Sequence, residues 1–506
     1  MSGKGIGGMF QLLESRRLLV CGMGLGMLLG AAQGLAAASP PNVVFILADD
    51  LGWRDTSATG STFYRTPHIE SLASQGLRFT DAYATPLCSP SRGAVLTGRY
   101  PERFQMYAAI TGASQAQPKT AKTGEPHQKT LAPGSRSFLP RSEVTIAEIL
   151  RDAGYATHFL GKWHLGVGGN GPAHHGFQNV PVFGGAGAGY FSPYKFLPKE
   201  FSSGPDGEYL PERFTEEALA IRRHEAKRKK PFFLALWHFN VHSPYEAKPD
   251  AIEKYRALAD PANPQRHPVM GAMVEALDHS IGRVLAELES LGLADNTIVI
   301  FASDNGGVGW KHGEDTVPIT SNLPARGWKG TLMEGGVRVP MIIRWPGVTP
   351  AGKTTSVPVH LVDLLPTLAT AAGAGLPANV ELDGMDLRPV IEGRRSQRER
   401  PLLQYFPMEF IPNGARSAAA LRDGDYKIIR FFAENGGKDA HELYNVATDV
   451  AESRNLAAEQ PERLADLARK LDNELARIGA RIPAPNPAYN PKAPLPRNWR
   501  GKLLKP

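Results

Sequence analysis

Two pairs of oxygen-bearing side chains follow apolar runs of the sequence that are rich in β-branched residues. Asp49 and Asp50 come directly after the run NVVFILA, and Asp304 and Asn305 come shortly after the run TIVIFA. In an open parallel sheet, ligand sites lie beyond the carboxyl ends of the strands, so the two pairs can meet at one point. Either pair alone is more typical of a turn. Together they favour a site of hard oxygen ligands, which suits Ca²⁺ or Mg²⁺.

A cysteine, Cys88, opens the segment CSPSRGAVLTGR. Ser89 is a favoured N-cap residue and Pro90 a favoured first helical residue, so we expect a helix to begin here. Cys88 would then lie at the helix N-terminus, where backbone N–H groups and the helix dipole favour an anion. Arg92, one turn further on, can reach back to the same point. A single thiol is more often a buried apolar side chain, and only these surroundings argue for chemistry.

The first 38 residues have the layout of a secretory signal. Lys4, Arg16 and Arg17 precede the apolar run LLVCGMGLGMLL, and the small residues 36–38 offer a cleavage site. The run is too short for a confident transmembrane helix. We therefore expect export to the periplasm or the extracellular space without a stable membrane anchor, and the Sec and twin-arginine pathways stay open as alternatives.

Loss of this segment would leave Cys88 as the one remaining cysteine, because Cys21 leaves with it. The formal net charge falls from +7 to +5 when Lys4, Glu14, Arg16 and Arg17 are removed. A mildly basic chain of this kind is compatible with an anionic substrate and is too weakly charged to argue for nucleic-acid binding.

Buried, strand-like runs alternate with helical patterns over most of the chain. The expected strands are residues 42–48, 156–160, 231–239, 297–302 and 339–345, and the expected helices are 145–153, about 270–291 and 362–372. Thr145 and Glu148 fit a capping box at the start of the first helix. This alternation predicts an α/β fold with a mainly parallel central sheet and helices on both faces.

The pattern changes at a basic joint around residue 395. We expect the main catalytic domain over residues 39–395, a small α+β subdomain over 396–482 and a proline-rich extended tail over 483–506. Within the subdomain, the expected strands are 402–406, 418–421 and 426–432, and an amphipathic helix begins at residue 461.

The polar stretch 109–141 lacks clear periodicity and carries several lysines and arginines. Long loops of this kind are commonly functional or disordered, so a solvated surface loop and a wall of a substrate pocket both stay open. We expect His174 and His175 to belong to a loop and not to bind a metal, because the side chains of two adjacent histidines point apart in most backbones. His238 lies inside an apolar run and is more typical of a core histidine.

The order of motifs resembles that of the formylglycine (type I) sulfatases, a family of the alkaline-phosphatase-like superfamily. The pattern C-x-P-x-R followed by L-T-G-R, at residues 88–99, resembles the family signature. Further matches follow in the family's order, at GKWHLG (161–166), HSP (242–244), DNGG (304–307), Lys329 with EGGVRVP (334–340) behind it, and ELYN (442–445). The resemblance spans about residues 40–490.

The resemblance also implies a mechanism and a set of roles. A formylglycine-generating maturation enzyme would oxidise Cys88 to 3-oxoalanine, whose hydrate attacks sulfur with one hydroxyl and expels sulfate with the other. One Ca²⁺ is implied, with Mg²⁺ less favoured, and four groups of residues act around it. They are the metal ligands Asp49, Asp50, Cys88, Asp304 and Asn305, the sulfate-binding Lys162 and Lys329, the diol-orienting Arg92 and His164, and the proton donor His242.

The resemblance therefore implies that the chain is a sulfatase that hydrolyses sulfate monoesters. Its basic stretch 109–141 and its expected export favour a sulfated carbohydrate as substrate, with aryl sulfates as surrogates. We expect Cys88 to face the oxygen cluster, and Lys162 and Lys329 to lie on the opposite, solvent-facing side. A phosphate or phosphonate monoesterase of the same superfamily and an inactive carbohydrate-binding relative that keeps the thiol are the alternatives.

Overall fold

An eight-stranded sheet forms the centre of the larger part of the fold, with the strand order β10-β2-β9-β8-β1-β7-β5-β6. Its strands are β1 (Asn42–Ala48), β2 (Leu77–Phe79), β5 (Ala156–Lys162), β6 (Asn179–Gly184), β7 (Phe232–Trp237), β8 (Thr297–Ser303), β9 (Met341–Arg344) and β10 (Lys353–Thr355). The five strands β8, β1, β7, β5 and β6 run parallel to one another. The mainly parallel sheet that the sequence predicts is therefore confirmed.

Strand β9 departs from the expected pattern, since it pairs antiparallel with both β8 and β2. A parallel return would need a crossover helix to carry the chain back to the other end of the sheet. Between β8 and β9 the described chain forms only the short helix α7 (Glu334–Val337). The chain leaves β8 at its carboxyl end and enters β9 at the same end, so β9 must run the opposite way.

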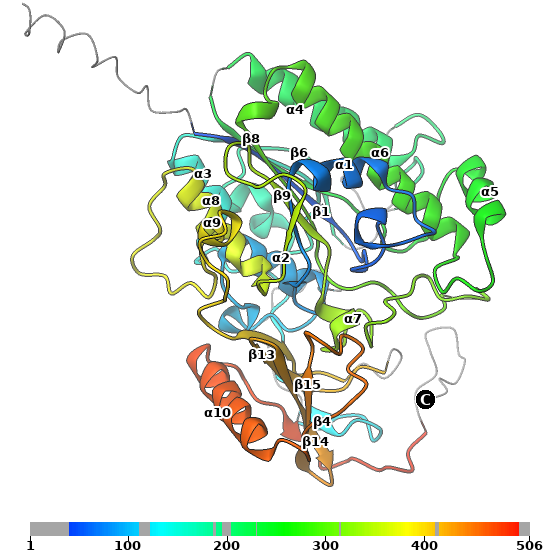
Figure 1. Ribbon diagram of the computed structural model, residues 1–506, viewed down its shortest axis with the longest axis vertical. Helices are drawn as coiled ribbons and strands as arrows, with labels where there is room; N and C mark the ends of the chain where they lie inside the picture. Colours follow the sequence, from blue (N-terminus) through cyan, green and yellow to red (C-terminus); the bar gives the residue numbers. More distant parts are fainter. Residues whose placement is uncertain are drawn as a thin grey trace, which may run out of the picture. The chain divides into compact units, whose positions relative to one another are not determined.

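Helices cover both faces of this sheet (Figure 1). The side chains of β1 alternate between two apolar cores, with Phe45 in one and Ile46 in the other. The larger helices are α1 (Pro67–Gln75), α2 (Cys88–Thr97), α3 (Ile146–Asp152), α4 (Leu210–Ala226), α5 (Pro249–Leu258), α6 (Pro268–Ser290) and α8 (Leu364–Ala371). Apolar residues of α1, α4 and α6 line the Ile46 core, and those of α2, α3 and α8 line the Phe45 core.

Helix α3 begins at the predicted capping box. The Thr145 hydroxyl accepts a hydrogen bond from the Glu148 N–H at 3.2 Å, and the Glu148 carboxylate accepts one from the Thr145 N–H at 2.8 Å. Two of the N–H groups that a helix start leaves unpaired are thereby satisfied.

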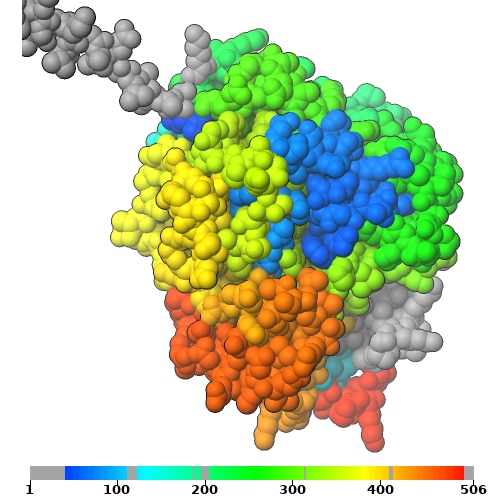
Figure 2. Space-filling view, in the orientation of Figure 1, coloured from blue at the N-terminus to red at the C-terminus, as the bar shows by residue number. Residues whose placement is uncertain are grey.

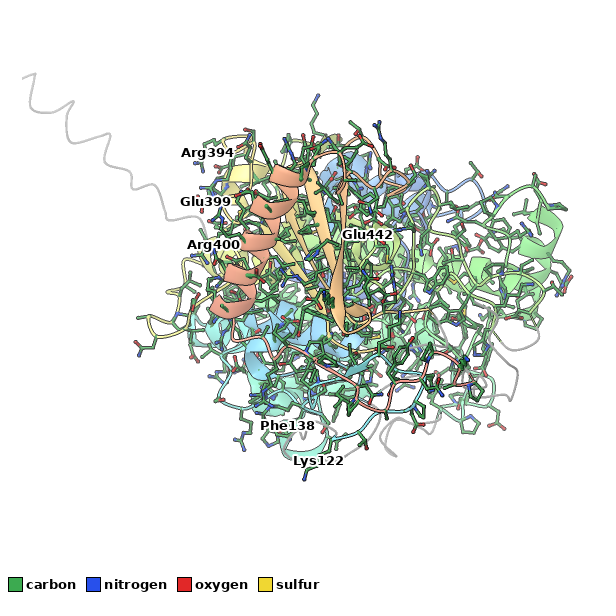
Figure 3. The ribbon with its side chains drawn as sticks, turned by 90° about the horizontal axis from the view of Figure 1, so that it is seen from below. Lys122, Phe138, Arg394, Glu399, Arg400 and Glu442 are labelled. Atoms are coloured by element: carbon green, nitrogen blue, oxygen red, sulfur yellow. The ribbon has the colours of Figure 1, made fainter. Side chains whose placement is uncertain are left out.

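A second, antiparallel sheet forms the C-terminal part of the fold. It contains β12 (Leu402–Phe406), β13 (Ala418–Asp423), β14 (Tyr426–Asn435) and β15 (Lys438–Asn445) in that order. Helix α10 (Pro461–Arg477) lies across it (Figure 3) and packs Leu467, Leu471 and Leu475 into the same core as Leu421. Strand β15 was not predicted, because only Leu443 and Tyr444 on it are buried and no alternating pattern marks it.

The basic joint near residue 395 is anchored to the main sheet's helices. The Arg398 guanidinium is buried and donates to both carboxylate oxygens of Asp363, at 2.6 and 2.9 Å. Arg394 and Arg400 point outward (Figure 3). In the space-filling view the C-terminal part, in orange and red, lies directly against the yellow and green residues of the main part (Figure 2).

Shorter elements complete the architecture of the computed structural model. They are β3 (Ala82–Tyr83), β4 (Thr130–Leu131), β11 (Val359–His360), α9 (Arg388–Ile391) and β16 (Ala484–Pro485). Strand β16 pairs antiparallel with β4, so the start of the proline-rich tail is fixed to the polar stretch 109–141.

The structure describes residues 40–110, 122–185, 189–194, 204–228, 230–312, 315–409 and 414–494. The predicted signal segment, residues 111–121 of the polar stretch and the end of the tail lie outside these ranges. Over the described ranges, no helix combines the length and the apolar character needed to cross a membrane.

Candidate active site

The four oxygen-bearing residues converge at the carboxyl edge of the main sheet. Strands β1 and β8 are parallel neighbours in register, with Ala48 opposite Ser303. The residues that follow, Asp49 and Asp50 on one strand and Asp304 on the other, therefore emerge side by side. One ligand atom from each of these carboxylates and from Cys88 lies within 4.8 Å of all the others, and all four residues are buried. The predicted convergence of the carboxylates and the thiol is what the structure shows.

Two buried oxygens of this cluster fit a cation. Asp49 Oδ1 and Asn305 Oδ1 lack a hydrogen-bond donor among the described residues. The amide Nδ2 of Asn305 donates to Asp50 Oδ1 at 2.9 Å, which orients the Asn305 oxygen. A buried acceptor without a donor is costly, and a metal ion would satisfy both. The donor set consists of carboxylate and amide oxygens, which Ca²⁺ prefers.

Both predicted lysines lie in this cluster, but only one matches the predicted placement. Lys329 Nζ contacts Asp50 Oδ1 at 2.6 Å and its side chain is partly exposed. Lys162 ends strand β5 with its side chain fully buried and its Nζ 2.5 Å from Asp49 Oδ2. The expectation that both lysines face solvent is therefore wrong for Lys162. It is the last residue of a strand that lies inside the sheet, between β7 and β6, and its side chain is closed off from solvent.

Arg92 is buried beneath the cluster. Its Nε and Nη2 both donate to Asp304 Oδ2, at 3.0 and 2.7 Å, and its Nη1 donates to the Lys162 carbonyl at 2.7 Å. Its guanidinium also lies 5.4 Å from the ring of Trp237. Arg92 therefore ties the end of β5 to the Asp304 turn, and it makes no hydrogen bond to Cys88 in the described structure.

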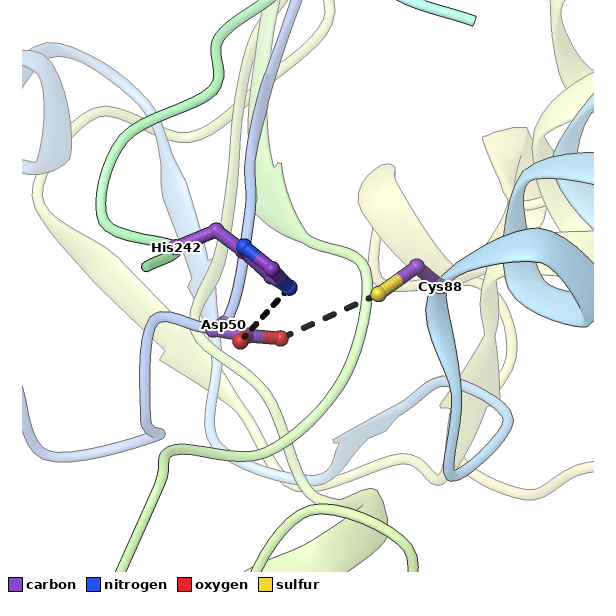
Figure 4. Close-up of side chains that lie close together, drawn as sticks. All are labelled: Asp50, Cys88 and His242. Carbon is purple, nitrogen blue, oxygen red and sulfur yellow. Dashed lines mark hydrogen bonds and ion pairs between the residues drawn. The ribbon is translucent and has the colours of Figure 1, made fainter. Parts of the chain in front are cut away.

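Cys88 is the first residue of α2, and the helix N-cap is Leu87. The predicted N-cap, Ser89, lies inside the first turn instead. Its hydroxyl accepts a hydrogen bond from the Ile110 N–H at 3.0 Å and so joins the helix to the polar stretch. Cys88 Sγ lies 3.9 Å from Asp50 Oδ1 (Figure 4). Burial is the main cause that raises the pKa of the Cys88 thiol to about 12, and the nearby Asp304 carboxylate adds to it.

His242 faces the same carboxylate from the loop after β7. Its Nε2 lies 3.7 Å from Asp50 Oδ2, and its Nδ1 is held by the Ser243 carbonyl at 2.7 Å (Figure 4). Burial, together with the charges of Lys162 and Lys329, lowers the pKa of His242 to about 3. The contact with Ser243 fixes Nδ1 of the ring, so that Nε2 faces the Asp50 carboxylate of the cluster.

His164 approaches from the loop after β5. Its Nε2 lies 2.7 Å from the Ile110 carbonyl, and its buried Nδ1 has no hydrogen-bond partner within the described chain. Burial lowers the pKa of His164 well below its usual range, and Lys162 reinforces this. Ile110 thus contacts both His164 and Ser89, which favours the pocket-wall interpretation for the start of the 109–141 stretch.

Sequence reasoning missed residues that shape the site through the backbone. Ser303 Oγ donates to the Asn305 carbonyl at 3.1 Å and accepts from the Leu51 N–H at 3.1 Å. A serine at the end of a buried strand, directly before the pair Asp304–Asn305, is the signal that could have revealed it.

Two other histidines of the sequence lie away from the cluster. His175 packs against Trp163 at 5.5 Å between ring centroids, and His238 Nε2 lies 3.2 Å from Ser280 Oγ. Both histidines are core residues outside the cluster.

A doubly covered α/β sheet with a buried, acidic cluster at its carboxyl edge is an arrangement suited to metal-assisted hydrolysis of anionic esters. The family model described as Sulfatase matches residues 41–374, and a model described as N-sulphoglucosamine sulphohydrolase, C-terminal, matches residues 327–481. The chain belongs to the sulfatase family of the alkaline-phosphatase-like superfamily and is a sulfuric ester hydrolase.

Relatives and solved structures agree with this assignment. Human arylsulfatase A is 35% identical over 479 residues, covering 88% of this chain and 84% of its own length. A sulfatase of Formosa agariphila is 31% identical, covering 92% and 93% respectively. Among solved structures, Ps i-CgsB in complex with k-i-k-neocarrahexaose is similar with a TM-score of 0.72 at 27% identity, covering 86% of this chain and 93% of that one.

Proposed function

We propose that this chain hydrolyses sulfate monoesters of a sulfated carbohydrate, with formylglycine at position 88 as nucleophile and one Ca²⁺ as cofactor. The observation that carries the proposal is the convergence of three buried carboxylates on the residue at position 88, within 4.8 Å. Hydrolysis of an anionic ester needs a nucleophile, a cation to offset the charge and a proton donor for the leaving alcohol, and this cluster has residues suited to each role.

Five residues would hold the metal. They are Asp49, Asp50, Asp304, Asn305 and the oxidised residue 88. When bound, the ion polarises the sulfate oxygens and offsets their charge. These five ligands are all oxygen donors, with no sulfur and no imidazole among them, and such a set favours Ca²⁺ over Zn²⁺.

Residue 88 supplies the nucleophilic oxygen once its aldehyde is hydrated, and covalent catalysis then divides one difficult step into two. A formylglycine-generating enzyme would be the maturation partner. Position 88 suits a nucleophile that carries negative charge, because it is the first residue of α2 and the dipole of a helix favours an anion at its N-terminus.

The remaining residues bind and orient the ester. Lys162 and Lys329 offset the sulfate charge, and each is held at the cluster by a carboxylate, Lys162 by Asp49 and Lys329 by Asp50. His164 and Arg92 position the nucleophile, the first through its unpartnered Nδ1 and the second through Asp304. His242 donates the proton to the departing alcohol from Nε2. Negative charge on the bound sulfate favours the protonated imidazole.

A carbohydrate substrate is supported by the basic character of the 109–141 stretch and by its contacts at Ile110. The similar structure of Ps i-CgsB holds k-i-k-neocarrahexaose. Export would place the enzyme where polysaccharides occur. If residues 1–38 are removed during export, the N-terminal sequence of the exported protein should begin near residue 39.

The test compares the sulfate and phosphate esters of one phenol and follows sulfate release from sulfated oligosaccharides. The proposal expects the sulfate ester to have the higher kcat/KM and inorganic sulfate to appear from the oligosaccharide. A higher kcat/KM for the phosphate ester would contradict it.

A further inference from the structure

A buried ion network joins the C-terminal sheet to the segment that carries Lys329. Lys427, on β14, has a side chain only 2% exposed, and its Nζ lies 2.9 Å from Glu334 Oε1 and 2.9 Å from Glu452 Oε1. Glu334 is the first residue of α7, and its N–H donates to Glu452 Oε2 at 3.0 Å. One ammonium on the C-terminal sheet therefore holds both carboxylates that fix the start of α7.

Glu334 is held from the other side by the main part of the fold. The Tyr83 hydroxyl donates to Glu334 Oε2 at 2.7 Å, and Arg338 Nη1 lies 3.2 Å from the same oxygen. Burial alone would raise the pKa of Glu334, but the charges of Lys427 and Arg338 lower it to about 2. Glu334 is therefore a fixed anion with cations on two sides.

Helix α7 is coupled to the site through close backbone packing. The Lys329 N–H donates to the Gly307 carbonyl at 3.2 Å, and the Gly306 N–H donates to the Gly336 carbonyl at 3.0 Å. A Cβ on Gly306 would lie 2.1 Å from the Gly335 carbonyl oxygen, so no side chain separates the two segments. A shift of α7 must therefore move both Lys329 and the turn that follows the metal residues.

Such a network is a poor source of stability. The transfer of charges from water into the protein interior is unfavourable, and a well-packed apolar replacement of a buried ion pair is often neutral or stabilising. The network does, however, constrain geometry, because each carboxylate oxygen has a fixed partner. Because the network lies between the C-terminal sheet and the turn that carries Lys329, this constraint can fix the position of Lys329 in the site.

We propose that Lys427 is a positioning residue of the active site: through Glu334 and Glu452 it sets the place of Lys329 relative to Asp50. The C-terminal sheet is then part of the catalytic apparatus although it contributes no side chain to the cluster. The inference rests on the proposed role of Lys329 in binding sulfate.

The test is a double-mutant cycle on an aryl sulfate. The double variant K427M/E452Q removes one positive and one negative charge together, so that no new unpaired ion is buried. It is measured alone and in the K329A background. Misplacement of a catalytic group by about 1 Å can cost on the order of 100-fold. We therefore expect K427M/E452Q to lower kcat/KM about 10- to 100-fold, with normal formylglycine content.

In the K329A background the same substitutions should change kcat/KM by no more than about twofold, because an effect exerted only through Lys329 disappears when Lys329 is absent, and about twofold is the margin within which such comparisons hold. Equal losses in both backgrounds, or no loss in the K329-containing enzyme, would overturn the inference. If K329A itself has wild-type activity, the role of Lys329 in the proposed function fails instead.

Two further variants separate positioning from folding. Lys470 on α10 pairs with Asp423 at 2.7 Å on the same C-terminal sheet, away from α7, so K470M should keep wild-type kcat/KM. K427R keeps the positive charge at this position, so its kcat/KM should be close to that of the wild type and well above that of K427M/E452Q. A K427R enzyme with a wild-type melting temperature and kcat/KM as low as that of the double variant would contradict a charge-based positioning role.

Discussion

Arg92 and Asp304 form a fully buried ion pair in which two guanidinium nitrogens donate to a single carboxylate oxygen, Oδ2. The other oxygen, Asp304 Oδ1, is left to accept the Asp50 N–H at 3.2 Å and to face the cluster. Burial and the neighbouring Asp49 raise the pKa of Asp304 to about 6, and Arg92 opposes this. The pair thus decides which oxygen of Asp304 is available to a cation.

The first prediction concerns this pair. A lysine at position 92 has one ammonium and cannot reproduce two bonds to Asp304 and one to the Lys162 carbonyl. We expect R92K to lower kcat/KM by about 100-fold and to lower the melting temperature measured by calorimetry. The matched control is R283K, because Arg283 pairs with Glu216 on the exposed surface. Equal behaviour of the two variants would contradict the role given to Arg92.

The second prediction concerns the metal. A chelator should abolish activity, and Ca²⁺ should restore it better than Zn²⁺, since the proposed ligands are all oxygens. D49N keeps the shape of the side chain, and it should weaken Ca²⁺ binding in a calorimetric titration. D278N is the control, because Asp278 is a buried carboxylate that accepts the His68 and Ile69 N–H groups instead. Full activity after exhaustive metal removal would refute the site.

The third prediction concerns acid stability. Burial lowers the pKa of His238 to about 4 from an ordinary value near 6.5, so the unfolded chain binds this proton more tightly than the folded chain. His238 should therefore destabilise the fold as the pH falls from about 6.5 to about 4, by about 1.4 kcal/mol per pH unit. Above pH 6.5 it should have no effect.

The measurement is urea unfolding of wild type and H238N at several pH values. The difference between their free energies of unfolding should shrink, or change sign, as the pH falls through this window. A difference that stays constant between pH 7 and pH 4.5 would show that His238 keeps its proton affinity on folding.

Much of the fold could be predicted from local pattern. The runs at β1 and β8 are continuous and apolar because both faces of these strands are buried, and the predicted bounds of β1 match the structure. Strand β15 was missed because it lies at an edge with mixed exposure. The direction of β9 could not be predicted from its own residues, since the path of the 304–340 segment decides it.

The site was predictable for a different reason. Asp49, Asp50 and Asp304 follow strands, and neighbouring parallel strands deliver their next residues to one edge of the sheet. The depth of Lys162 could not be predicted, because it depends on β5 lying inside the sheet, next to β7. Likewise, the link from Lys427 to Glu334 joins residues 93 positions apart, and no local pattern marks it.

The fourth prediction addresses the nucleophile. C88A should lose turnover while keeping the wild-type melting temperature, because position 88 lies at a loop-to-helix junction and the substitution removes one sulfur atom. Substantial activity in C88A would exclude residue 88 as the nucleophile.

The most direct test of the central claim is mass spectrometry of the tryptic peptide that spans residues 79–92 and contains position 88. Enzyme purified from a host that has a formylglycine-generating enzyme should give the mass of formylglycine at this position. Across preparations, the apparent kcat should rise in proportion to the modified fraction. A fully active preparation in which residue 88 is entirely unmodified cysteine would contradict the account.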